Sequence, residues 1–267
     1  MRKRALLIAL FVLLIVVIQP ACTKFIKPTS VLLFDESING FAEAALNNLS
    51  IAYTKVTDYG AIVSVLQSVA WDLIVFDNPN QGIENAYTLL YDYVTRGGRL
   101  VMSTWKLNTT HPLWGALGYV YSQSLSNKTD VFRLNKLSSL WKDPYTATDL
   151  YFASSEDNYY GTNAQPGSVT GTGKLFATFE EGETTAGAVF IANSGRTILN
   201  AFLLDDGALM PEGVPIYPVD YNTNGTPDSV EWWTNEIKYV CSTPGKKIQP
   251  TILSVLSTEE SLEKNSK

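Results

Sequence analysis

The sequence predicts an α/β fold: an open, mostly parallel sheet with helices on both faces and one insertion rich in loops and strands. Short apolar runs of strand length recur between residues 30 and 104, and stretches with a helical period separate them. Parallel strands that are buried on both faces are continuous apolar runs, and crossover helices join them. The 267 residues, 45% of them hydrophobic, provide enough material for one sizeable core.

The first part of the chain alternates between strand and helix. Apolar residues at Phe41, Ala45 and Leu49 follow a helical period, and the pair Gly97 and Gly98 is typical of a helix end. The expected strands are residues 30–35, 51–56, 71–77 and 99–104, and the expected helices are residues 39–49, 59–70 and 83–98.

After residue 104 the pattern changes to shorter strands. Residues 111–119 predict a short helix and a turn, and residues 119–134 predict strands on either side of a turn at residues 126–130. Residues 137–173 are rich in Ser, Thr, Tyr, Asn and Gly without a clear period, which indicates an insertion. The expected later elements are strands at residues 174–180, 186–192 and 196–204 and a final helix at residues 228–241.

The N-terminus has the features of a bacterial export signal. Residues 2–4 are basic, and residues 5–18 form an apolar run that is short for a membrane span, which needs about 20 residues. The following QPAC resembles a lipoprotein box, in which Ala21 precedes Cys22, although Gln19 departs from the aliphatic residue usual at its position. An uncleaved anchor and simple secretion are the alternatives, and all three place the body outside the cytoplasm. The expected segments are a signal peptide at residues 1–21 and a lipidated Cys22 with a linker over residues 22–30.

Charge and cysteine content narrow the class of protein. The net charge is −6, which argues against a nucleic-acid partner, because such a partner requires a basic surface. Cys22 and Cys241 are too few for a disulfide framework. With Cys22 lipidated, Cys241 is expected to be a buried residue of the last helix; a disulfide between the two is the alternative. In the same helix Trp232 and Trp233 are adjacent, so we expect one to be buried and the other to lie at a rim.

Five segments carry a family resemblance: WDLIVFD, YVTRGGRLVMSTW and HPLWGALG in the first half of the chain, and GRTILNAFLLDDG and WWTNEIKYV towards its end. Together they resemble the class I glutamine amidotransferase-like superfamily, in particular its extracytoplasmic, trehalose-utilisation-type relatives. The resemblance covers residues 31–241 and implies a flavodoxin-like sheet. It leaves residues 242–267 as a flexible tail.

The resemblance also implies what a catalytic member would carry. Working members use a cysteine on a strand-to-helix elbow, with a histidine and an acid from a later strand. The elbow corresponds to MSTWKL, where Ser103 and Thr104 are the only hydroxyls and no cysteine is present. The single histidine, His111, follows this segment, and none is present near residues 202–206. Because a serine nucleophile needs a base to accept its proton, acyl transfer of the family type is not expected.

A ligand crevice is expected where the strands end, because open α/β sheets bind ligands beyond the carboxyl ends of their strands. The residues expected there are Asp35, Asp77, Ser103, Trp105 and Asp205. Carboxylates beside a tryptophan suit a cation or the hydroxyl groups of a sugar, and a pair of carboxylates suits glycoside hydrolysis. The alternative is that these polar residues cap helices and solvate turns.

Residues 220–231, DYNTNGTPDSVE, match the calcium-binding loop of an EF-hand. The pattern places carboxyl or amide oxygens at alternate positions around a glycine, because calcium takes about six to eight oxygen ligands on a sharply bent backbone. Prolines precede the loop, so no entering helix is expected. The alternative is a capping box in which Asp228 and Glu231 satisfy the start of the last helix without a metal ion. The expected ligands are Asp220, Asn222, Asn224, the Thr226 carbonyl, Asp228 and Glu231, with Gly225 at the turn.

The sequence therefore favours a non-catalytic, calcium-stabilised lipoprotein of the cell envelope that binds a protein or a carbohydrate. The alternative is an extracytoplasmic hydrolase that acts on glycans or small molecules through carboxylates at the carboxyl edge of the sheet. A third hypothesis is an accessory component of an envelope transport or surface-layer assembly.

Overall fold

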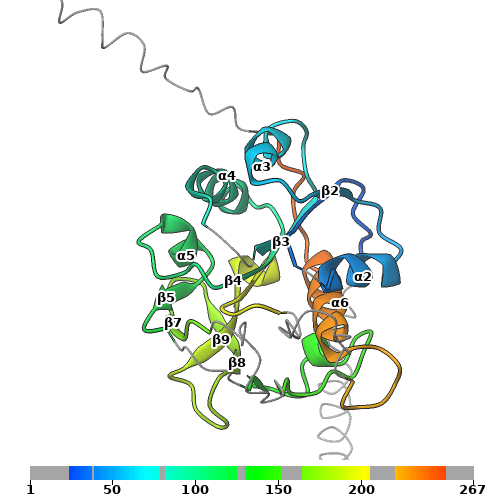
Figure 1. Cartoon of the computed structure of the whole chain (residues 1–267), viewed down its shortest axis with the longest axis vertical. Coiled ribbons are helices and arrows are strands. Elements are labelled where there is room, and N and C mark those ends of the chain that lie inside the picture. The colour runs from blue at the N-terminus through cyan, green and yellow to red at the C-terminus, as the bar shows by residue number, and fades with distance from the viewer. Residues whose placement is uncertain are drawn as a thin grey trace, which may run out of the picture.

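The computed structural model describes residues 24–37, 39–78, 82–124, 130–151, 164–204 and 220–250. These residues form a mixed α/β body around one ten-stranded sheet (Figure 1). The strands are β1 (Val31–Asp35), β2 (Thr54–Val56), β3 (Leu73–Asn78), β4 (Leu100–Thr104), β5 (Tyr119–Tyr121), β6 (Phe132–Arg133), β7 (Gly167–Val169), β8 (Lys174–Thr178), β9 (Gly187–Ala192) and β10 (Thr197–Asn200). The helices are α2 (Phe41–Asn48), α3 (Tyr59–Leu66), α4 (Glu84–Thr95), α5 (Pro112–Ala116) and α6 (Asp228–Cys241), with short 3₁₀ turns η1 (Ser139–Trp141) and η2 (Asn193–Gly195).

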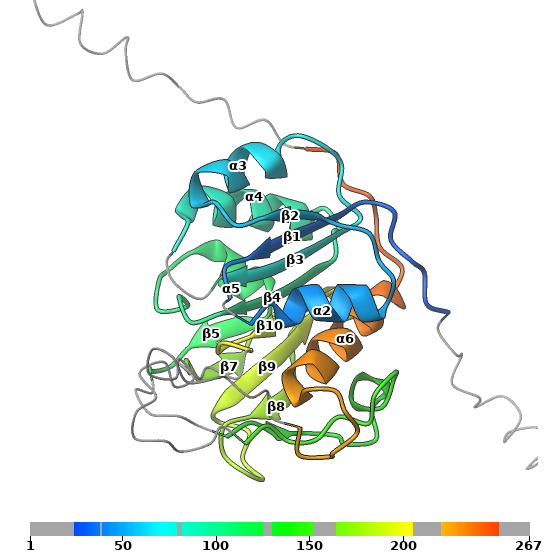
Figure 2. The same cartoon turned by 45° about the vertical axis from the view of Figure 1, so that its right-hand side comes forward.

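The central part of the sheet is parallel. The strand order is β2-β1-β3-β4-β10-β9-β7-β5, and the first five strands in this order run in the same direction. Strands β1 and β4 are buried along their whole length, which is why they are continuous apolar runs in the sequence. The predicted open, mostly parallel sheet with helices on both faces is confirmed (Figure 2).

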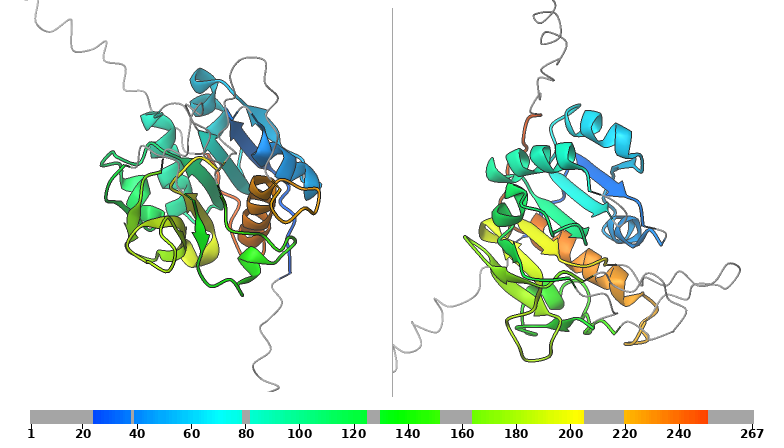
Figure 3. Two further views of the ribbon diagram at one scale, coloured as in Figure 1. Left: turned by 60° about the horizontal axis from the view of Figure 1, so that its bottom comes forward. Right: turned by 60° about the vertical axis from the view of Figure 1, so that its left-hand side comes forward.

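Successive side chains of the parallel strands supply two separate cores, because they point to opposite faces of the sheet. Leu33 and Val75 belong to the core under α2 and α6, whereas Leu32 and Ile74 belong to the core under α3, α4 and α5. Helices α2 and α6 lie side by side over their face (Figure 3). In strands β1 and β3, every second side chain counted from Leu33 and from Val75 therefore points to the face that α2 and α6 cover.

The later strands form the antiparallel part of the sheet. Strand β9 is antiparallel to β10, and both β7 and β8 pair with β9. Strands β5 and β6 lie on either side of the predicted turn at residues 126–130, but they do not pair with each other. Instead β5 pairs with β7 and β6 pairs with β8. The sequence located these strands but not their partners, which come from distant segments.

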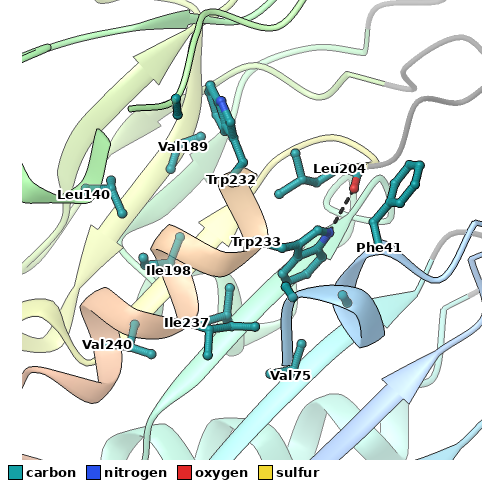
Figure 4. Close-up of a cluster of buried hydrophobic side chains, with 14 of the residues drawn as sticks. Phe41, Val75, Leu140, Val189, Ile198, Leu204, Trp232, Trp233, Ile237 and Val240 are labelled. Atoms are coloured by element: carbon teal, nitrogen blue, oxygen red, sulfur yellow. Dashed lines mark hydrogen bonds between the residues drawn. The ribbon is translucent and has the colours of Figure 1, made fainter. Parts of the chain in front are cut away.

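Trp232 and Trp233 are both buried, which corrects the expectation that one of them lies at a rim. Each is 0% exposed, and the two side chains leave α6 in different directions (Figure 4). The Trp232 indole donates a hydrogen bond to the Thr148 carbonyl at 2.9 Å, and its ring centroid lies 4.6 Å from that of Trp141. The Trp233 indole donates to the Leu204 carbonyl at 2.9 Å. Residues of the predicted insertion cover Trp232, and the segment after β10 covers Trp233, so both directions lead into the interior.

The residues before β1 are held against the edge where the parallel strands begin. The backbone N–H of Ile26 donates to the Cys241 carbonyl at 3.2 Å. Thr29 donates its backbone N–H and its hydroxyl to the Asp72 carboxylate at 2.9 and 2.6 Å. Residues 24–30, expected as a linker, are thus part of the folded body.

The segment after α6 packs at the same edge (Figure 2). Ile248 is 6% exposed and forms an antiparallel bridge with Trp71. The Arg99 guanidinium donates two hydrogen bonds to the Thr243 carbonyl, at 3.0 and 2.7 Å. Residues 242–250 are therefore fixed, which corrects the expectation of a flexible tail that begins at residue 242.

The predicted signal peptide at residues 1–21, Cys22 and residues 251–267 lie outside the described residues. Cys241 is buried, as predicted, and burial raises the pKa of its thiol to about 12. Within the described ranges, no helix combines the length and the apolar character needed to cross a bilayer.

Candidate functional site

Four polar side chains form one row where the parallel strands end. The strand register pairs Asp35 with Asp77 and Asp77 with Ser103, and it pairs Ser103 with Asn200. Paired residues point to the same face, here the face that α2 and α6 cover. The sequence placed the first three residues at this edge, and the structure brings them together. They lie inside the protein, because Asp35 is 2%, Asp77 1% and Ser103 0% exposed; Asp205 lies outside the described residues.

Ser103 lies in the segment that the sequence resemblance matched to the nucleophile elbow, and its hydroxyl is engaged inside the fold. Its hydroxyl donates to the Phe202 carbonyl at 2.9 Å and accepts from the Leu204 N–H at 2.9 Å. None of residues 103–107 has a positive φ, whereas a nucleophile elbow is a sharp, strained turn. Ser103 therefore joins the end of β4 to the segment after β10, and its hydroxyl is not presented to a substrate.

Asp35 is tied to its surroundings by hydrogen bonds and one ion pair. Its Oδ1 accepts from the Ser37 N–H at 2.9 Å and from the Ser37 hydroxyl at 2.6 Å. The Lys55 ammonium lies 3.3 Å from Asp35 Oδ2 and 2.6 Å from Glu43 Oε2. Burial lowers the pKa of Lys55, but the contacts with Glu43 and Asp35 outweigh it and raise the pKa. Lys55 is thus a permanent cation between two carboxylates.

The row ends in a buried pair that the sequence analysis missed. The Asn200 amide donates to Glu236 Oε2 at 2.8 Å, and both side chains are 0% exposed. Burial raises the pKa of Glu236 to about 8, so its carboxyl keeps a proton at neutral pH. Within the described part of the chain, Glu236 Oε1 and Asn200 Oδ1 have no hydrogen-bond partner. The available signal was position, because Glu236 lies three and four residues from buried tryptophans on α6.

Trp105 and His111 lie beyond the row. The Lys106 ammonium is 3.3 Å from the centroid of the partly exposed Trp105 ring, a cation–π contact. His111 is the N-cap of α5: its Nδ1 accepts from the Leu113 N–H at 3.1 Å, and burial lowers its pKa. His111 thus satisfies a backbone N–H at the start of α5.

The loop at residues 220–225 has the backbone bend that the calcium-loop pattern predicts. The Asp220 carboxylate accepts from the N–H groups of Asn224 at 3.2 Å and Gly225 at 2.8 Å. Gly225 has a φ of 88°, in the left-handed region that favours glycine. The chain therefore turns around Asp220 and carries Asn222 and Asn224 back towards α6.

The two acids of the first turn of α6 face this loop and do not form the capping box that was the alternative. Pro227 is the N-cap residue, and no side chain of the described residues caps the helix. Asp228 Oδ2 accepts from the Tyr221 N–H at 3.1 Å. Glu231 accepts amide hydrogens from Asn222, at 2.9 Å, and from Asn224. The expected side-chain ligands are thus linked in one network.

The charges of this network repel one another. Burial raises the pKa of Asp228 and of Glu231, and the Asp220 charge raises both further. The hydrogen bonds from the Tyr221 N–H to Asp228 and from the two asparagines to Glu231 lower these pKa values only in part. A cation placed among the three carboxylates would relieve this repulsion.

The donor chemistry of the loop fits calcium. Among the described residues, no three His, Cys, Asp or Glu side chains already converge as a metal site. The pattern, however, draws half of its ligands from amide and backbone oxygens. Asp228 Oδ1 is buried and has no well-formed hydrogen bond within the described ranges. Asn222 and Asn224 now direct their amide nitrogens at Glu231, and a half-turn of each amide group would direct oxygens inward instead.

Comparison with known proteins gives a fold but no close relative. No family model and no curated protein matches the sequence. A ThuA-like protein from Bacteroides uniformis has a TM-score of 0.50 and 12% identity, over 83% of this chain and 95% of that chain. A GMP synthase component from Thermoplasma acidophilum has a TM-score of 0.49 and 10% identity, over 80% of this chain and 94% of that chain. An α-L-fucosidase from Paenibacillus thiaminolyticus has a TM-score of 0.48 and 12% identity, over 79% of this chain and 32% of that chain.

The fold therefore defines the class. The chain has the flavodoxin-like, amidotransferase-like α/β fold that the sequence resemblance implied, in the form shared with the ThuA-like protein. At this level of identity the likeness concerns the fold alone, and the function depends on the residues of the site.

Proposed function

We propose that this protein is a non-catalytic lipoprotein of the cell envelope, whose amidotransferase-like domain is stabilised by calcium and binds a protein or a carbohydrate. The observation that carries the proposal is the state of Ser103. Its hydroxyl is buried, donates to one backbone group and accepts from another. No cysteine replaces it at the end of β4, and His111 is the N-cap of a separate helix.

The calcium part of the proposal rests on residues 220–231. Asp220, Asp228 and Glu231 would supply carboxylate oxygens, Asn222 and Asn224 amide oxygens, and Thr226 its carbonyl oxygen. Bound calcium would add positive charge among the three carboxylates. Because α6 begins within the loop, the ion would fix this helix on the sheet. Three carboxylates give a modest affinity, which suits the calcium-rich exterior of a cell.

The location rests on the N-terminal sequence. An apolar run follows three basic residues and leads to the lipoprotein-like QPAC with Cys22. The described chain begins at Lys24, shortly after this cysteine, and is attached to the body from Ile26 onward. A lipid on Cys22 would therefore hold the body close to a membrane.

Exposed aromatic side chains support a binding role. Tyr151 is 41% and Tyr221 50% exposed, and their ring centroids lie 5.3 Å apart in an edge-to-face arrangement. Tyr221 belongs to the calcium-loop segment, so an ion there would hold one ring of the pair in place. Tyrosines that combine an apolar ring with a polar hydroxyl suit the contact surface of a glycan or a protein.

The second candidate is a hydrolase that uses carboxylates at the same edge. Asp35 and Asp77 favour it, because they are direct neighbours in the strand register and point to one face. Their exposures of 2% and 1%, together with the ion pair between Asp35 and Lys55, favour the binding protein over the enzyme.

An activity assay with matched variants tests the proposal. The full chain would be incubated with glutamine and with chromogenic glycosides, with and without calcium, beside Ser103→Ala and Asp77→Asn variants. We expect no turnover above a blank in any sample. Turnover that Ser103→Ala abolishes would establish an acyl-transfer enzyme, and turnover that Asp77→Asn abolishes would establish the hydrolase.

A further inference from the structure

The edge of the sheet where the parallel strands begin carries exposed basic side chains. We call this region the terminal edge; it comprises residues 24–30, 67–72, 92–99, 170–174, 193–197 and 242–250. Its exposed basic residues are Lys24, Lys27, Arg96, Lys174, Lys246 and Lys247. The acidic residues of these segments are Asp72 and Asp92. A local excess of positive charge is notable in a protein whose net charge is −6.

Both acids of the terminal edge are already engaged. Asp92 pairs with Arg96 at 2.7 Å. Asp72 accepts from Thr29 and from the backbone N–H of Ser30. Burial raises the pKa of Asp72, but these hydrogen bonds and the charge of Lys247 outweigh it and lower the pKa. Asp72 thus offsets part of the charge of Lys247, but two acids cannot balance the six exposed basic residues of this edge.

Four lysines of the terminal edge have no evident role in the fold. Lys24, Lys27, Lys246 and Lys247 are exposed, and none makes an ion pair with another residue that the structure describes. Backbone hydrogen bonds attach the segments that carry them. The N–H of Lys246 donates to the Gly97 carbonyl at 3.3 Å, and the N–H groups of Ile26 and Ile248, next to Lys27 and Lys247, donate to Cys241 and Trp71. The fold thus presents these lysines on segments that are attached at this edge.

Exposed apolar side chains lie among these lysines. Ile26, between Lys24 and Lys27, is 49% exposed, and Val69 on the same edge is 44% exposed. The backbone N–H of Ile26 is bonded to Cys241, which keeps the residue at the surface. Cations together with apolar side chains are the composition that binds an anionic lipid surface, where the charges meet headgroups and the apolar groups enter the interface.

The chain leads from this edge to the proposed lipid anchor, so this step rests on the proposed function. Ile26 follows Cys22 by four positions, and an extended chain of that length reaches about 14 Å. At physiological salt an anionic membrane attracts cations over a screening length of about 8 Å. A surface tethered within about 14 Å of the bilayer can come within this range.

We propose that the terminal edge is the membrane-facing surface of the protein and docks on anionic phospholipid headgroups. The carboxyl edge, with the polar row and residues 220–231, then faces away from the bilayer. Lipid docking fixes an orientation that a single acyl anchor with a flexible linker would leave free.

Hydrogen exchange on the reconstituted full chain tests this orientation. The lipidated protein would be placed in vesicles of phosphatidylcholine, and in the same vesicles with added phosphatidylglycerol. We expect exchange in residues 24–30 and 242–250 to slow in the anionic vesicles and to recover at high salt, while residues 220–231 do not change. Each neutralised lysine should lower the docking equilibrium about fivefold. The variant Lys24→Gln, Lys27→Gln, Lys246→Gln, Lys247→Gln should lose the protection.

A matched pair of double variants separates a local surface from a change in total charge. Lys246→Gln with Lys247→Gln should weaken the protection. Lys106→Gln with Lys136→Gln removes the same charge, after β4 and beside Asp149, and should leave the protection intact. Equal protection in both lipid mixtures, or equal loss in both double variants, would overturn the proposal.

The lipid anchor on Cys22 and the docking of the terminal edge can be tested separately. The mass of the N-terminal peptide reports whether Cys22 carries a lipid. An unmodified Cys22 would contradict the anchoring part of the proposed function, and sedimentation of the chain with the same vesicles would then test the surface directly. A lipidated chain without dependence on phosphatidylglycerol would overturn the docking surface alone.

Discussion

The two edges of the parallel sheet differ in where their charged side chains lie. At the carboxyl edge, charged and polar groups are turned inward: Asp35 meets Lys55, and Asn200 meets Glu236 beneath α6. At the terminal edge, lysines such as Lys246 are exposed and lack ion-pair partners among the described residues. Buried charges need internal partners and so affect stability strongly, whereas exposed charges affect it little. Substitutions at the first edge should therefore change folding, and those at the second should change only what the surface binds.

The largest expected effect concerns Glu236. The pKa of its carboxyl is about 8 in the folded chain, against an ordinary value of 4.5. Between these two pH values the folded chain keeps a proton that the unfolded chain has lost. The free energy of unfolding should therefore fall as the pH rises from about 4.5 to about 8, by up to a few kcal/mol. Glu236→Gln should remove this part of the pH dependence, as measured by urea unfolding at several pH values.

The control for this change is Glu180→Gln, which removes a carboxyl from an exposed position. This variant should keep the pH dependence of the unmodified protein. If Glu236→Gln shows the same slope as Glu180→Gln, the buried carboxyl does not carry the effect.

The next largest effect is expected at Ser103. Ser103→Ala leaves the Phe202 carbonyl and the Leu204 N–H without their buried partner, which should cost about 1–3 kcal/mol of the free energy of unfolding. Chemical denaturation measures this loss. Ser64→Ala, at an exposed position on α3, should change stability by less than about 0.5 kcal/mol. Equal effects of the two substitutions would contradict the role given to Ser103.

Calcium should stabilise the protein by a smaller amount. At a concentration of ten times its dissociation constant, binding to the folded chain alone adds about 1.4 kcal/mol. The melting temperature should therefore rise by about 3–6 °C. Asp220→Asn keeps an acceptor for the turn but removes a ligand charge, and it should abolish the rise. Asp58→Asn at the N-cap of α3 should preserve it. Equal melting temperatures of the unmodified protein in calcium and in chelator would exclude the ion.

The smallest effect on stability is expected at the terminal edge. Lys246→Gln with Lys247→Gln should change the free energy of unfolding by less than about 0.5 kcal/mol, because both side chains are exposed. Chemical denaturation of the double variant measures this difference. A loss comparable to that of Ser103→Ala would mean that these lysines hold the last segment in place.

The sequence predicted the sheet because its central strands are buried on both faces, which makes them apolar runs. It also placed Asp35, Asp77 and Ser103 at one edge, since parallel strands end on the same side. The register that aligns them is visible only in the structure.

The contacts of α6 were harder to predict. Nothing in the sequence indicated that Thr148, from the predicted insertion, would accept a hydrogen bond from Trp232 while Leu204 accepts one from Trp233. The burial of both tryptophans was therefore missed. Glu236 was overlooked for the same reason, because its partner Asn200 is 36 residues away. The docking of Ile248 on Trp71 joins segments further apart still. Local periodicity carries no information about such pairs.

The attachment of the first described residues has a mechanical consequence. Strand β1 is paired along both sides, with β2 and β3, and the chain enters it directly from the segment held by Asp72. Tension applied through an N-terminal tether would pull along the axis of this strand, across hydrogen bonds that run between strands. The hydrogen bonds of β1 with β2 and with β3 would then share the load and would be sheared together. They would not be opened one bond at a time. A chain tethered in this way would resist extraction from its N-terminal end better than from an edge strand such as β5.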